Sequence, residues 1–396
     1  MRHISHKIRI YPNNATITKL VMCFGVARFA YNWGLQHCKQ VHEEGGSCPS
    51  GYDLSKSLNA IKKDEFPWMY EVSKWIPQMS LYNLASAFQS FFKKRSRFPR
   101  FKKRGRCRDS FYIGLGFKAE GNIIHIPSIG WIRMSQSLRF PGRPLSVVVS
   151  RLSGKYFASI QVELSDDYVY PHACESQASV GVDLGVKDLA VLSTGKKFSN
   201  PKILRFFESR LKRLQRRLSK KRKGSMNRVK ARGLLAKCHE KIRNIRSNNL
   251  HSLTSYLVEN FRFIGVEDLN VSGMLKNHKL SKSIVDASFF EIKRQLSYKS
   301  KLAGSEVVEI DRFFPSTKLC YACRFKLDSL DLSVRKWECP QCGRGHNRDV
   351  NAAINILNEA ARRHREAENA CGEGVRRCGR KAASRSFKKQ EGGIRC

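Results

Sequence analysis

Acidic residues are scarce in this chain of 396 residues, in which 33 Asp and Glu stand against 74 Lys and Arg and leave a formal net charge of +41. At this net charge the basic side chains of a compact fold repel one another. The composition therefore excludes a protein that works without charged partners and indicates a polyanionic partner. Nucleic acid is the partner that we expect first. An anionic membrane surface is the alternative.

Long apolar runs are also missing. No run approaches the roughly 18 residues that a membrane-spanning helix needs, and no amphipathic basic helix stands out. The opening residues, MRHISHKIRIYP, include no apolar stretch of signal-peptide length. We therefore expect no membrane partner and a reducing, cytoplasmic compartment. Hydrophobic residues make up 41% of the chain, which is enough for a soluble globular protein of two or three domains.

A disulfide framework is not expected, because the 13 cysteines are odd in number and unevenly spaced. Four of them form a C-x2-C-x15-C-x2-C pattern, namely Cys320, Cys323, Cys339 and Cys342. Two such pairs of soft thiolates match a tetrahedral zinc site, and four thiolates leave no open position for a substrate, so the zinc is expected to be structural. A redox role is the alternative. Gly343 suits the turn after the second pair, whereas Arg324 occupies that position after the first.

The first half of the chain predicts strands that flank helices. Residues 4–10 alternate apolar and basic side chains as a half-buried strand does, residues 15–94 show a helical pattern, and residues 110–165 contain several short strand-like runs. A β-rich module that is interrupted by a helical insertion would explain the isolated first strand.

Two segments concentrate positive charge. Residues 93–106, KKRSRFPRFKKRGR, interleave Phe with Arg and Lys, a pattern that suits contacts with phosphates and stacking on sugars or bases. Residues 206–246 form a basic helical region, either continuous or broken into a hairpin near Gly224 or Gly233, that carries 16 Lys or Arg against Glu208 and Glu240. The alternative without a ligand is a solvated linker for residues 93–106 and a solvated helix face for residues 206–246. A solvated helix face, however, normally mixes charges of both signs.

Three acidic residues lie at the ends of predicted elements in the second half. Asp183 follows an apolar strand, Glu267 ends the strand FIGVE, and Asp349 opens an amphipathic helix. Singly, each has a structural explanation, as a turn residue or as a helix cap (with Asp268 the alternative to Glu267). Together, three convergent acids are what two divalent ions need to hold the attacking and leaving oxygens of a phosphodiester.

Several blocks of the sequence resemble the TnpB (OrfB) proteins of insertion-sequence transposons, a family of transposon-encoded RNA-guided nucleases related to compact type V CRISPR effectors. GVDLG, GVEDLNVSGM, FPSTKLCYAC…CPQCG and HNRDVNAAINIL carry the resemblance in the second half. KIRIYP, RFAYNWGL, LASAFQSFFKK and RFPRFKKRG carry it in the first, so that it extends from residue 1 to about residue 360.

The resemblance implies a multidomain α/β protein. Its parts would be a wedge-type β-barrel (1–12 and 106–170), a helical recognition lobe (13–105), a RuvC/RNase H-like nuclease domain (178–317 and 347–364), an inserted zinc ribbon (318–346) and a basic disordered tail (365–396). It also implies a bacterial or archaeal, nucleoid-associated protein whose monomeric or dimeric state on RNA stays open.

The activity implied is that of a Mg²⁺-dependent endonuclease, which binds a transposon-derived guide RNA and cuts double-stranded DNA next to a short transposon-adjacent motif. Asp183, Glu267 and Asp349 would be catalytic and hold two Mg²⁺ ions, and the four cysteines would hold one Zn²⁺. Lys74 and Gln78 would contact the adjacent motif. Further nucleic-acid contacts are expected from Phe98, Arg100, Phe101, Lys102, Lys103, Arg213, Arg216 and Arg217.

The sequence departs from the family pattern at Asn347, where an Asp is usual two residues before the last catalytic acid. Two alternative functions stay open on the same scaffold. One is a nuclease-inactive, RNA-guided DNA-binding repressor, although no acid of the expected triad is missing. The other is a transposase that performs strand transfer, although those enzymes commonly use the order Asp, Asp, Glu. A plain zinc-ribbon RNA-binding protein leaves the positions of the acids unexplained.

Overall fold

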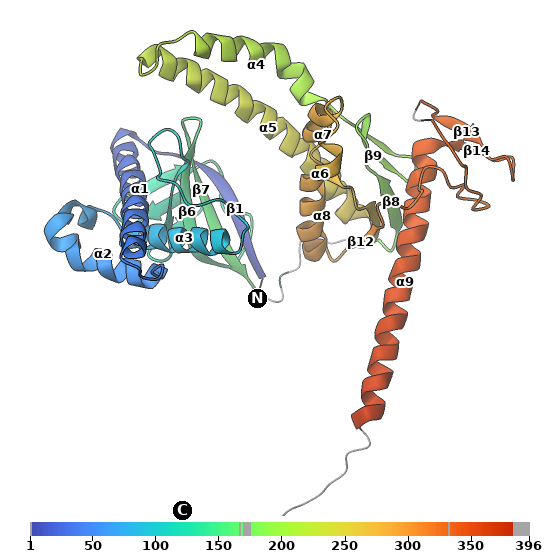
Figure 1. Cartoon of the computed structure of the whole chain (residues 1–396), viewed down its shortest axis with the longest axis horizontal. Helices are drawn as coiled ribbons and strands as arrows, with labels where there is room; N and C mark the ends of the chain where they lie inside the picture. The colour runs from blue at the N-terminus through green and yellow to red at the C-terminus, as the bar shows by residue number, and fades with distance from the viewer. Residues whose placement is uncertain (1, 166–167, 169–175, 332, 383–396) are drawn as a thin grey trace, which may run out of the picture. The chain divides into compact units, whose positions relative to one another are not determined.

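A computed structural model describes residues 2–165, 168, 176–331 and 333–382 of the chain (Figure 1). These residues fall into two compact units, Met1–Tyr168 and Val169–Cys396, and each unit is described by itself. In the described part of the chain, no helix combines the length and the apolar character needed to cross a membrane.

The first unit contains a seven-stranded antiparallel sheet in the order β2-β6-β7-β1-β5-β4-β3. Its strands are β1 (Arg2–Tyr11), β2 (Asp109–Ile113), β3 (Lys118–Glu120), β4 (Ile123–Ile126), β5 (Gly130–Met134), β6 (Arg143–Leu152) and β7 (Lys155–Leu164). Strand β1 lies inside the sheet, paired with β7 and β5, although its neighbours in space follow it by more than a hundred residues. The expectation that the isolated first strand joins the later strand-rich segment is thus confirmed.

Helices of the same unit pack on this sheet. They are α1 (Asn14–Glu43), α2 (Gly51–Glu65), the 3-10 helix η1 (Pro67–Glu71) and α3 (Trp75–Phe92). Sheet and helices share one hydrophobic core, in which Phe24 of α1 lies 5.4 Å from Phe111 of β2 between ring centroids. The helical insertion therefore completes the core of the sheet that it interrupts.

The second unit is built on a five-stranded mixed sheet in the order β10-β9-β8-β11-β12. Its strands are β8 (Ser179–Asp183), β9 (Asp188–Leu192), β10 (Lys197–Ser199), β11 (Phe263–Glu267) and β12 (Glu306–Ile310). β8, β11 and β12 run parallel, whereas β9 and β10 are antiparallel to their neighbours. The carboxyl ends of β8 and β11 consequently meet at one edge of the sheet.

Between β10 and β11 the chain forms a long helical hairpin of α4 (Ile203–Ser219) and α5 (Met226–Asn260). The turn between them contains Gly224, whose φ of 88° lies in the left-handed region that glycine adopts without strain. Gly233, the other candidate for the break, lies inside α5. The remaining helices of this part are α6 (Val271–Met274), α7 (Ser281–Ala287) and α8 (Phe289–Ala303), followed after β12 by the small hairpin of β13 (Lys336–Glu338) and β14 (Gly345–Asn347).

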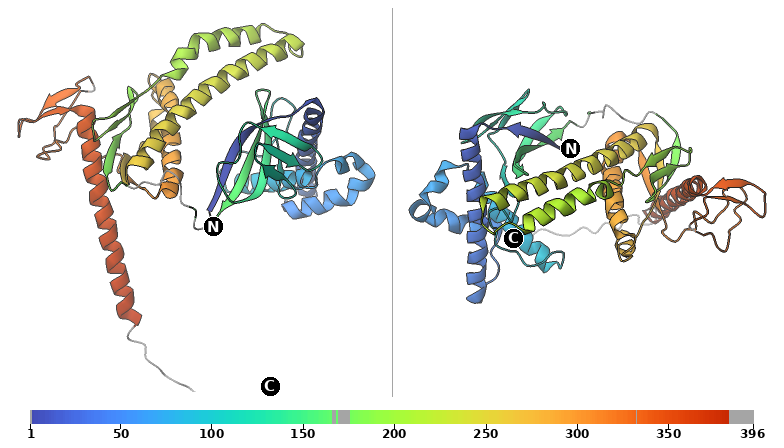
Figure 2. Two further views of the ribbon diagram at one scale, coloured as in Figure 1. Left: turned by 180° about the vertical axis from the view of Figure 1, so that it is seen from behind. Right: turned by 90° about the horizontal axis from the view of Figure 1, so that it is seen from above.

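The last helix, α9 (Arg348–Ala382), crosses the sheet on the face opposite to α5 and α8 (Figures 1 and 2). Side chains alternate across a strand, so Val180 and Val182 pack into the core with α5 and α8 while Gly181 faces α9. A Cβ added at Gly181 would lie 1.9 Å from the carbonyl oxygen of Ala353. The absence of a side chain there allows the helix backbone to lie directly on the strand.

Helix α9 is longer than the sequence predicts. We expected irregular structure from residue 365 onward, but the helix continues to Ala382. Alanine, glutamate, arginine and lysine dominate this stretch and favour helix, whereas its glycines lower helix propensity without abolishing it. The rest of the predicted tail, residues 383–396, lies outside the described residues.

The contact between α9 and β8 makes a test of the fold. Replacing Gly181 with Ala is expected to lower the free energy of unfolding by about 3 kcal/mol, because the new methyl group overlaps the backbone of α9. Gly233→Ala is the matched control, since no atom lies within 4 Å of an added Cβ and the site is in the interior of α5. That variant is expected to gain about 1 kcal/mol from helix propensity. Thermal unfolding of the full-length chain measures both, and equal midpoints would contradict the packing described here.

Candidate active site and zinc site

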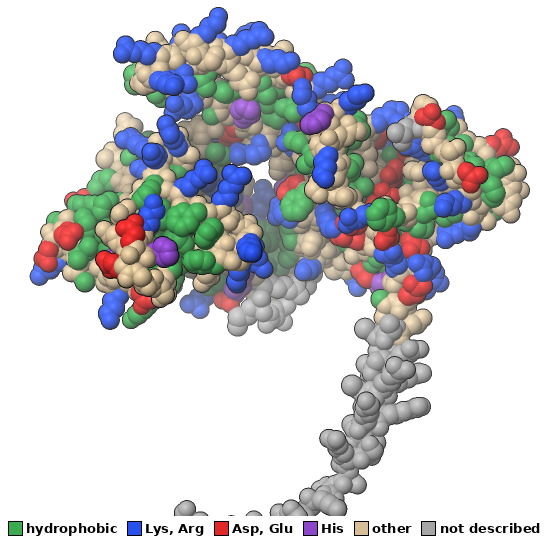
Figure 3. All heavy atoms as spheres, in the orientation of Figure 1, with side chains coloured by type: hydrophobic (Ala, Val, Ile, Leu, Met, Phe, Trp, Pro, Cys, Tyr) green, Lys and Arg blue, Asp and Glu red, His purple; other side chains and the backbone are tan. Residues whose placement is uncertain are grey.

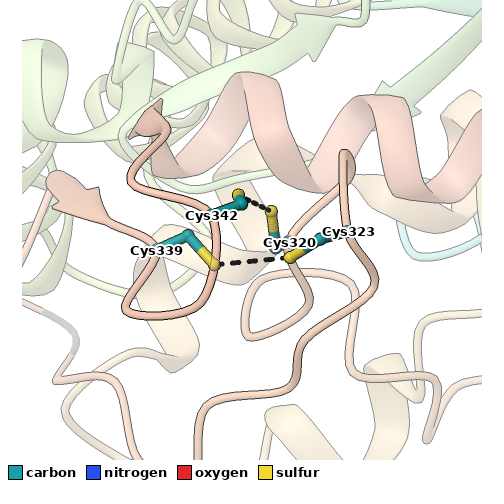
Figure 4. A group of neighbouring side chains, drawn as sticks. All are labelled: Cys320, Cys323, Cys339 and Cys342. Atoms are coloured by element: carbon teal, nitrogen blue, oxygen red, sulfur yellow. Dashed lines mark hydrogen bonds between the residues drawn. The ribbon is translucent and has the colours of Figure 1, made fainter.

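The four cysteines of the C-x2-C-x15-C-x2-C pattern come together in space (Figure 4). Their Sγ atoms all lie within 4.8 Å of one another, with 3.7 Å between Cys320 and Cys342 and 3.5 Å between Cys323 and Cys339. These separations are too long for disulfides and close to the ~3.8 Å expected between thiolates that share a tetrahedral zinc ion. The residues therefore fit one structural Zn²⁺, as the sequence predicts.

Both turns that present the cysteines have the same form. The amide of Arg324 donates to the carbonyl of Cys320 at 3.0 Å, and the amide of Gly343 donates to that of Cys339 at 2.9 Å. Both residues also have a φ of 67°. The sequence left the first turn in question because it has Arg324 in place of glycine. The turn forms nevertheless, with a non-glycine residue in the left-handed region.

The backbone of Arg324 provides a test of the zinc turn. Arg324→Gly should raise the stability of the zinc-loaded protein by about 1 kcal/mol, because glycine adopts this φ without steric cost. Gly343→Ala should lower it by a similar amount. Zinc release to a colorimetric chelator is the measurement, with slower release expected for Arg324→Gly and faster release for Gly343→Ala. Identical release from both variants would show that the two turns carry no strain.

The three predicted acids lie close together at one edge of the five-stranded sheet. Asp183 ends β8 and Glu267 ends β11, and these strands are parallel neighbours in which Val182 is paired with Val266. Asp349 lies in the first turn of α9. Burial, followed by the charges of Glu267 and Asp349, raises the pKa of Asp183 to about 7. The structure therefore brings together three carboxylates that lie more than 80 residues apart in sequence.

Hydrogen bonds and ion pairs hold two of these acids. Ser316 donates its hydroxyl to Oε1 of Glu267 at 2.5 Å, and burial raises the pKa of Glu267. Arg335 donates through Nη1 to both carboxylate oxygens of Asp349, at 3.2 and 3.3 Å. Neither Ser316 nor Arg335 was singled out from the sequence. Ser316 lies within the family-like block FPSTKLC, but nothing in its spacing points to Glu267.

The helix-cap explanations considered for Asp349 and Glu267 do not apply in this fold. Asn347 accepts a hydrogen bond from the amide of Val350 at 3.3 Å and so caps α9, which leaves Asp349 without a capping role. Asn is as good a helix cap as Asp, so this departure from the family pattern keeps the cap. Asp268 forms ion pairs with Lys293 and Arg312 on the surface, and Asn270 caps α6.

A cavity of about 930 Å³ opens beside these acids. Asp183 and Asp349 line it together with Arg335 and Arg348, so both acidic and basic side chains face the cavity here. Lys and Arg side chains from other elements also line it, namely Lys187, Lys202, Arg205, Lys212, Lys279 and Lys282, and so do the acids Asp188, Glu208 and Asp286. Carboxylates beside concentrated positive charge can hold divalent cations and a phosphate backbone at once.

The three carboxylates are not drawn as tightly together as the cysteines. Among the described residues, the four cysteines form the one group of three or more metal-type side chains whose donor atoms all lie within 4.8 Å. The acids nevertheless fit divalent cations in their chemistry, because three oxygen-donor side chains from separate elements share one site, where burial, followed by the charges of the other two acids, raises the pKa of Asp183.

The predicted contacts of the first unit differ in how far they already contact protein. Lys74 is exposed just before α3, and Gln78 is half-buried in that helix. In the loop after α3, Arg100 and Lys103 are exposed. Phe98 and Phe101 are also exposed, but Phe98 packs edge-on against Phe88 and Phe91, and Phe101 lies under Lys39. The ammonium of half-buried Lys102 lies 3.7 Å from the ring centroid of Tyr31. Part of this basic loop is thus used to fix it on α1.

The predicted contacts on α4, by contrast, are all exposed. Arg213, Arg216 and Arg217 lie on the side of α4 away from its buried residues, where they form a groove with Ser209, Lys212 and Lys220. Among the described residues, no carboxylate lines this groove, although Lys212 pairs with Glu208 at 3.1 Å. Figure 3 shows Lys and Arg side chains gathered over α4 and α5. We call the six residues of this groove the α4 groove.

Comparisons with other proteins agree with the motifs. A family model described as "Probable transposase" (OrfB_IS605) matches residues 159–278, a "Cas12f1-like, TNB domain" model matches residues 289–356, and a "Helix-turn-helix domain" model (HTH_OrfB_IS605) matches residues 1–47. In this structure, the last of these regions forms β1 and the single long helix α1.

Two bacterial proteins match nearly the whole chain. A Streptomyces pristinaespiralis protein named "Putative RNA-guided DNA endonuclease" is 39% identical over 376 residues, covering 93% of this chain and 91% of that protein. The Escherichia coli K12 protein "Putative RNA-guided DNA endonuclease InsQ" is 34% identical over 388 residues, covering 93% and 94%. Among solved structures, the Cas12f1 chain in a complex with sgRNA and target DNA has a TM-score of 0.51 at 15% identity, over 88% of this chain and 83% of that one, which shows a shared fold.

The repulsion among the acids gives a test that needs no nucleic acid. Because the pKa of Asp183 is raised to about 7, the folded chain holds this proton more tightly than the unfolded chain does. The resulting stability is present in full below the unfolded pKa of 3.8 and is lost progressively as the pH rises from there through 7. Between pH 5 and pH 8 the wild type should therefore lose up to about 3 kcal/mol through this group, in buffer without divalent cations.

The variant Asp183→Asn removes the titrating group and should escape that loss. Its thermal midpoint should exceed that of the wild type at pH 8 by more than it does at pH 5. Asp268→Asn, which changes a surface acid paired with Lys293 and Arg312, is the matched control. Parallel pH profiles for wild type and Asp183→Asn would show that the three carboxylates do not strain the fold.

Proposed function

The chain belongs to the TnpB (OrfB) family of transposon-encoded RNA-guided nucleases, which is related to compact type V CRISPR effectors, and from this premise we propose that it is an RNA-guided DNA endonuclease. It binds a transposon-derived guide RNA and cuts double-stranded DNA next to a short adjacent motif. The observation that carries the proposal is the convergence of Asp183, Glu267 and Asp349 beside a basic cavity.

The second unit is then a RuvC/RNase H-like nuclease domain. Its support is the strand order β10-β9-β8-β11-β12, in which an antiparallel three-stranded part continues into parallel strands. The acids lie at the carboxyl ends of adjacent parallel strands and on the helix that crosses them, which is where an open α/β sheet holds its ligands. In the first unit, the seven-stranded sheet takes the place of the wedge-type barrel and α1–α3 that of the recognition lobe.

Catalysis in this proposal is hydrolysis of a phosphodiester bond by water. Asp183, Glu267 and Asp349 would hold two Mg²⁺ ions, and such ions activate the attacking water and stabilise the charge on the leaving 3′ oxygen. Burial raises the pKa values of Asp183 and Glu267, and bound divalent cations would favour the ionised forms of both. Arg335 and Arg348 present positive charge to the same cavity, where a scissile phosphate would meet it.

Recognition would be divided between RNA and protein. Base pairing of the guide reads the target sequence, while the protein reads the adjacent motif and the shape of the duplex. Lys74 and Gln78 are our candidates for the motif contact. The α4 groove, which has five cations and no carboxylate, is the candidate for tracking a nucleic-acid backbone.

The nuclease proposal is tested with the purified protein–guide complex and a plasmid that carries a matched target in Mg²⁺. Asp183→Ala should reduce cleavage on the order of 10³-fold while guide and target binding are retained, because the loss falls on metal-stabilised transition-state charge. Asp268→Ala, one residue from Glu267, should cut like the wild type. Binding without cleavage by the wild type would favour the repressor, and joined donor–target products would favour the transposase that the description of one matching family model suggests.

The α4 groove has its own test. Replacing Arg213, Arg216 and Lys220 with Gln should weaken guide RNA binding. It should also reduce the magnitude of the slope of log affinity against log salt by up to about 3, because a protein with fewer phosphate contacts releases fewer counterions on binding. The control removes the same charge from cations that are paired with acids, namely Lys293, Arg294 and Arg362. Equal losses of affinity in both triple variants would mean that only net charge matters.

A further inference from the structure

Two buried asparagines of α9 form hydrogen bonds to the backbone of the segment that leads into the zinc site. Asn355 donates from Nδ2 to the carbonyl oxygens of Ser316, at 2.9 Å, and Leu319, at 2.6 Å. Asn351, one turn earlier, donates to the same Leu319 carbonyl at 2.8 Å and accepts from the amide of Tyr321 at 3.1 Å. Together they hold the backbone on both sides of Cys320.

Asparagine is unusual at these two positions, because both are buried. Asn351 is 1% exposed and Asn355 is fully buried, among the buried apolar residues Ala352, Ala353 and Ile356. Burying an amide side chain costs free energy unless its hydrogen bonds are made, and the buried Oδ1 of Asn355 has no partner among the described residues, so an apolar side chain would pack at less cost. The carbonyls of Phe314, Pro315, Lys318 and Cys320 accept backbone amides. Those of Ser316 and Leu319 accept from the two asparagine side chains instead. The amides therefore fix where this segment runs.

The segment connects the zinc site with a catalytic acid. At one end, the Sγ of Cys320 is one of the four zinc ligands and lies 3.1 Å from Nε2 of His346. At the other end, buried Ser316 donates its hydroxyl to Glu267 at 2.5 Å. Asn355 contacts the backbone at both ends, at Ser316 and at Leu319 next to Cys320. Zinc ligand and acid are thus joined by a short chain of hydrogen bonds.

We propose that Ser316 and Asn355 are positioning residues through which the zinc module sets the placement of Glu267, so that zinc retention and divalent-cation binding at the acids are coupled. The coupling deepens the nuclease function proposed above and rests on it for its effect on cleavage. The zinc module is then a brace for the active site as well as a folding unit. Outer hydrogen bonds of this kind orient metal ligands, and their loss typically costs 10- to 100-fold in affinity.

The experiment uses the full-length protein–guide complex and Mn²⁺ as the probe, with binding taken as the difference from a Glu267→Gln complex. Ser316→Ala should keep its zinc and its guide affinity, yet need between about 10- and 100-fold more Mn²⁺ for half-saturation. Ser316→Thr, which keeps the hydroxyl, should bind Mn²⁺ like the wild type. A general packing defect would not be rescued by this bulkier residue. Wild-type Mn²⁺ binding by a zinc-loaded Ser316→Ala complex would overturn the proposal.

The second variant tests the zinc end and stands in if Ser316→Ala fails to fold. Asn355→Leu, which has the same branched shape but a larger side chain, should release zinc to a chelator faster by about tenfold and should raise the Mn²⁺ requirement as well. The double variant, Ser316→Ala with Asn355→Leu, should need no more Mn²⁺ than whichever single variant binds it more weakly, because both substitutions interrupt the same chain of contacts. Faster zinc release with unchanged Mn²⁺ binding would overturn the coupling. Wild-type protein that binds Mn²⁺ at Glu267 but cuts no DNA would instead contradict the nuclease function alone.

Discussion

The gathering of three carboxylates in a partly buried site is the constraint on which the second unit depends. Asp183, Glu267 and Asp349 share one edge of a sheet, where burial and their own charges favour protonation of Asp183. A fold that only needed stability would not place acids there, since buried charges cost free energy unless they are paired. The site instead surrounds them with Arg335, Arg348 and the hydroxyl of Ser316. This arrangement is understandable if the acids are kept for divalent cations.

The close contact of α9 with the sheet serves the same site. Gly181 lets the helix lie on β8, and Gly265 of β11 leaves room for Ala360 in a similar way, with an added Cβ at 2.8 Å from the Cβ of that alanine. Asp349 is in the first turn of this helix, so the distance between helix and sheet decides how near it comes to Asp183. The cap from Asn347 and the amides of Asn351 and Asn355 then fix the same end of α9 against the zinc module.

Acidic and basic side chains are distributed differently over the described residues. Some acids outside the candidate active site are paired, as Asp268 is with Lys293 and Arg312 and Asp286 is with Arg246. In the α4 groove, by contrast, five cations lie side by side, and of these Lys212 pairs with Glu208. Paired charges stabilise little at a surface, whereas a row of cations with few acids beside it attracts a polyanion over a longer range. Part of the net charge of +41 thus lies where a nucleic-acid backbone would use it.

The sequence by itself determined those features that depend on local spacing. The cysteine pattern predicted four converging thiolates, residues 206–246 predicted a basic helical hairpin, and each acid was placed at the end of its element. Tertiary structure alone decided which distant groups meet. Ser316 contacts Glu267, 49 residues away, and Arg335 contacts Asp349 across the zinc module. Asn355 looked like an ordinary polar residue of an amphipathic helix, yet it is buried, because α9 is covered on more sides than a single apolar stripe predicts. Periodicity reports which face of an element is buried, but the partners on that face depend on how strands and helices pack in three dimensions.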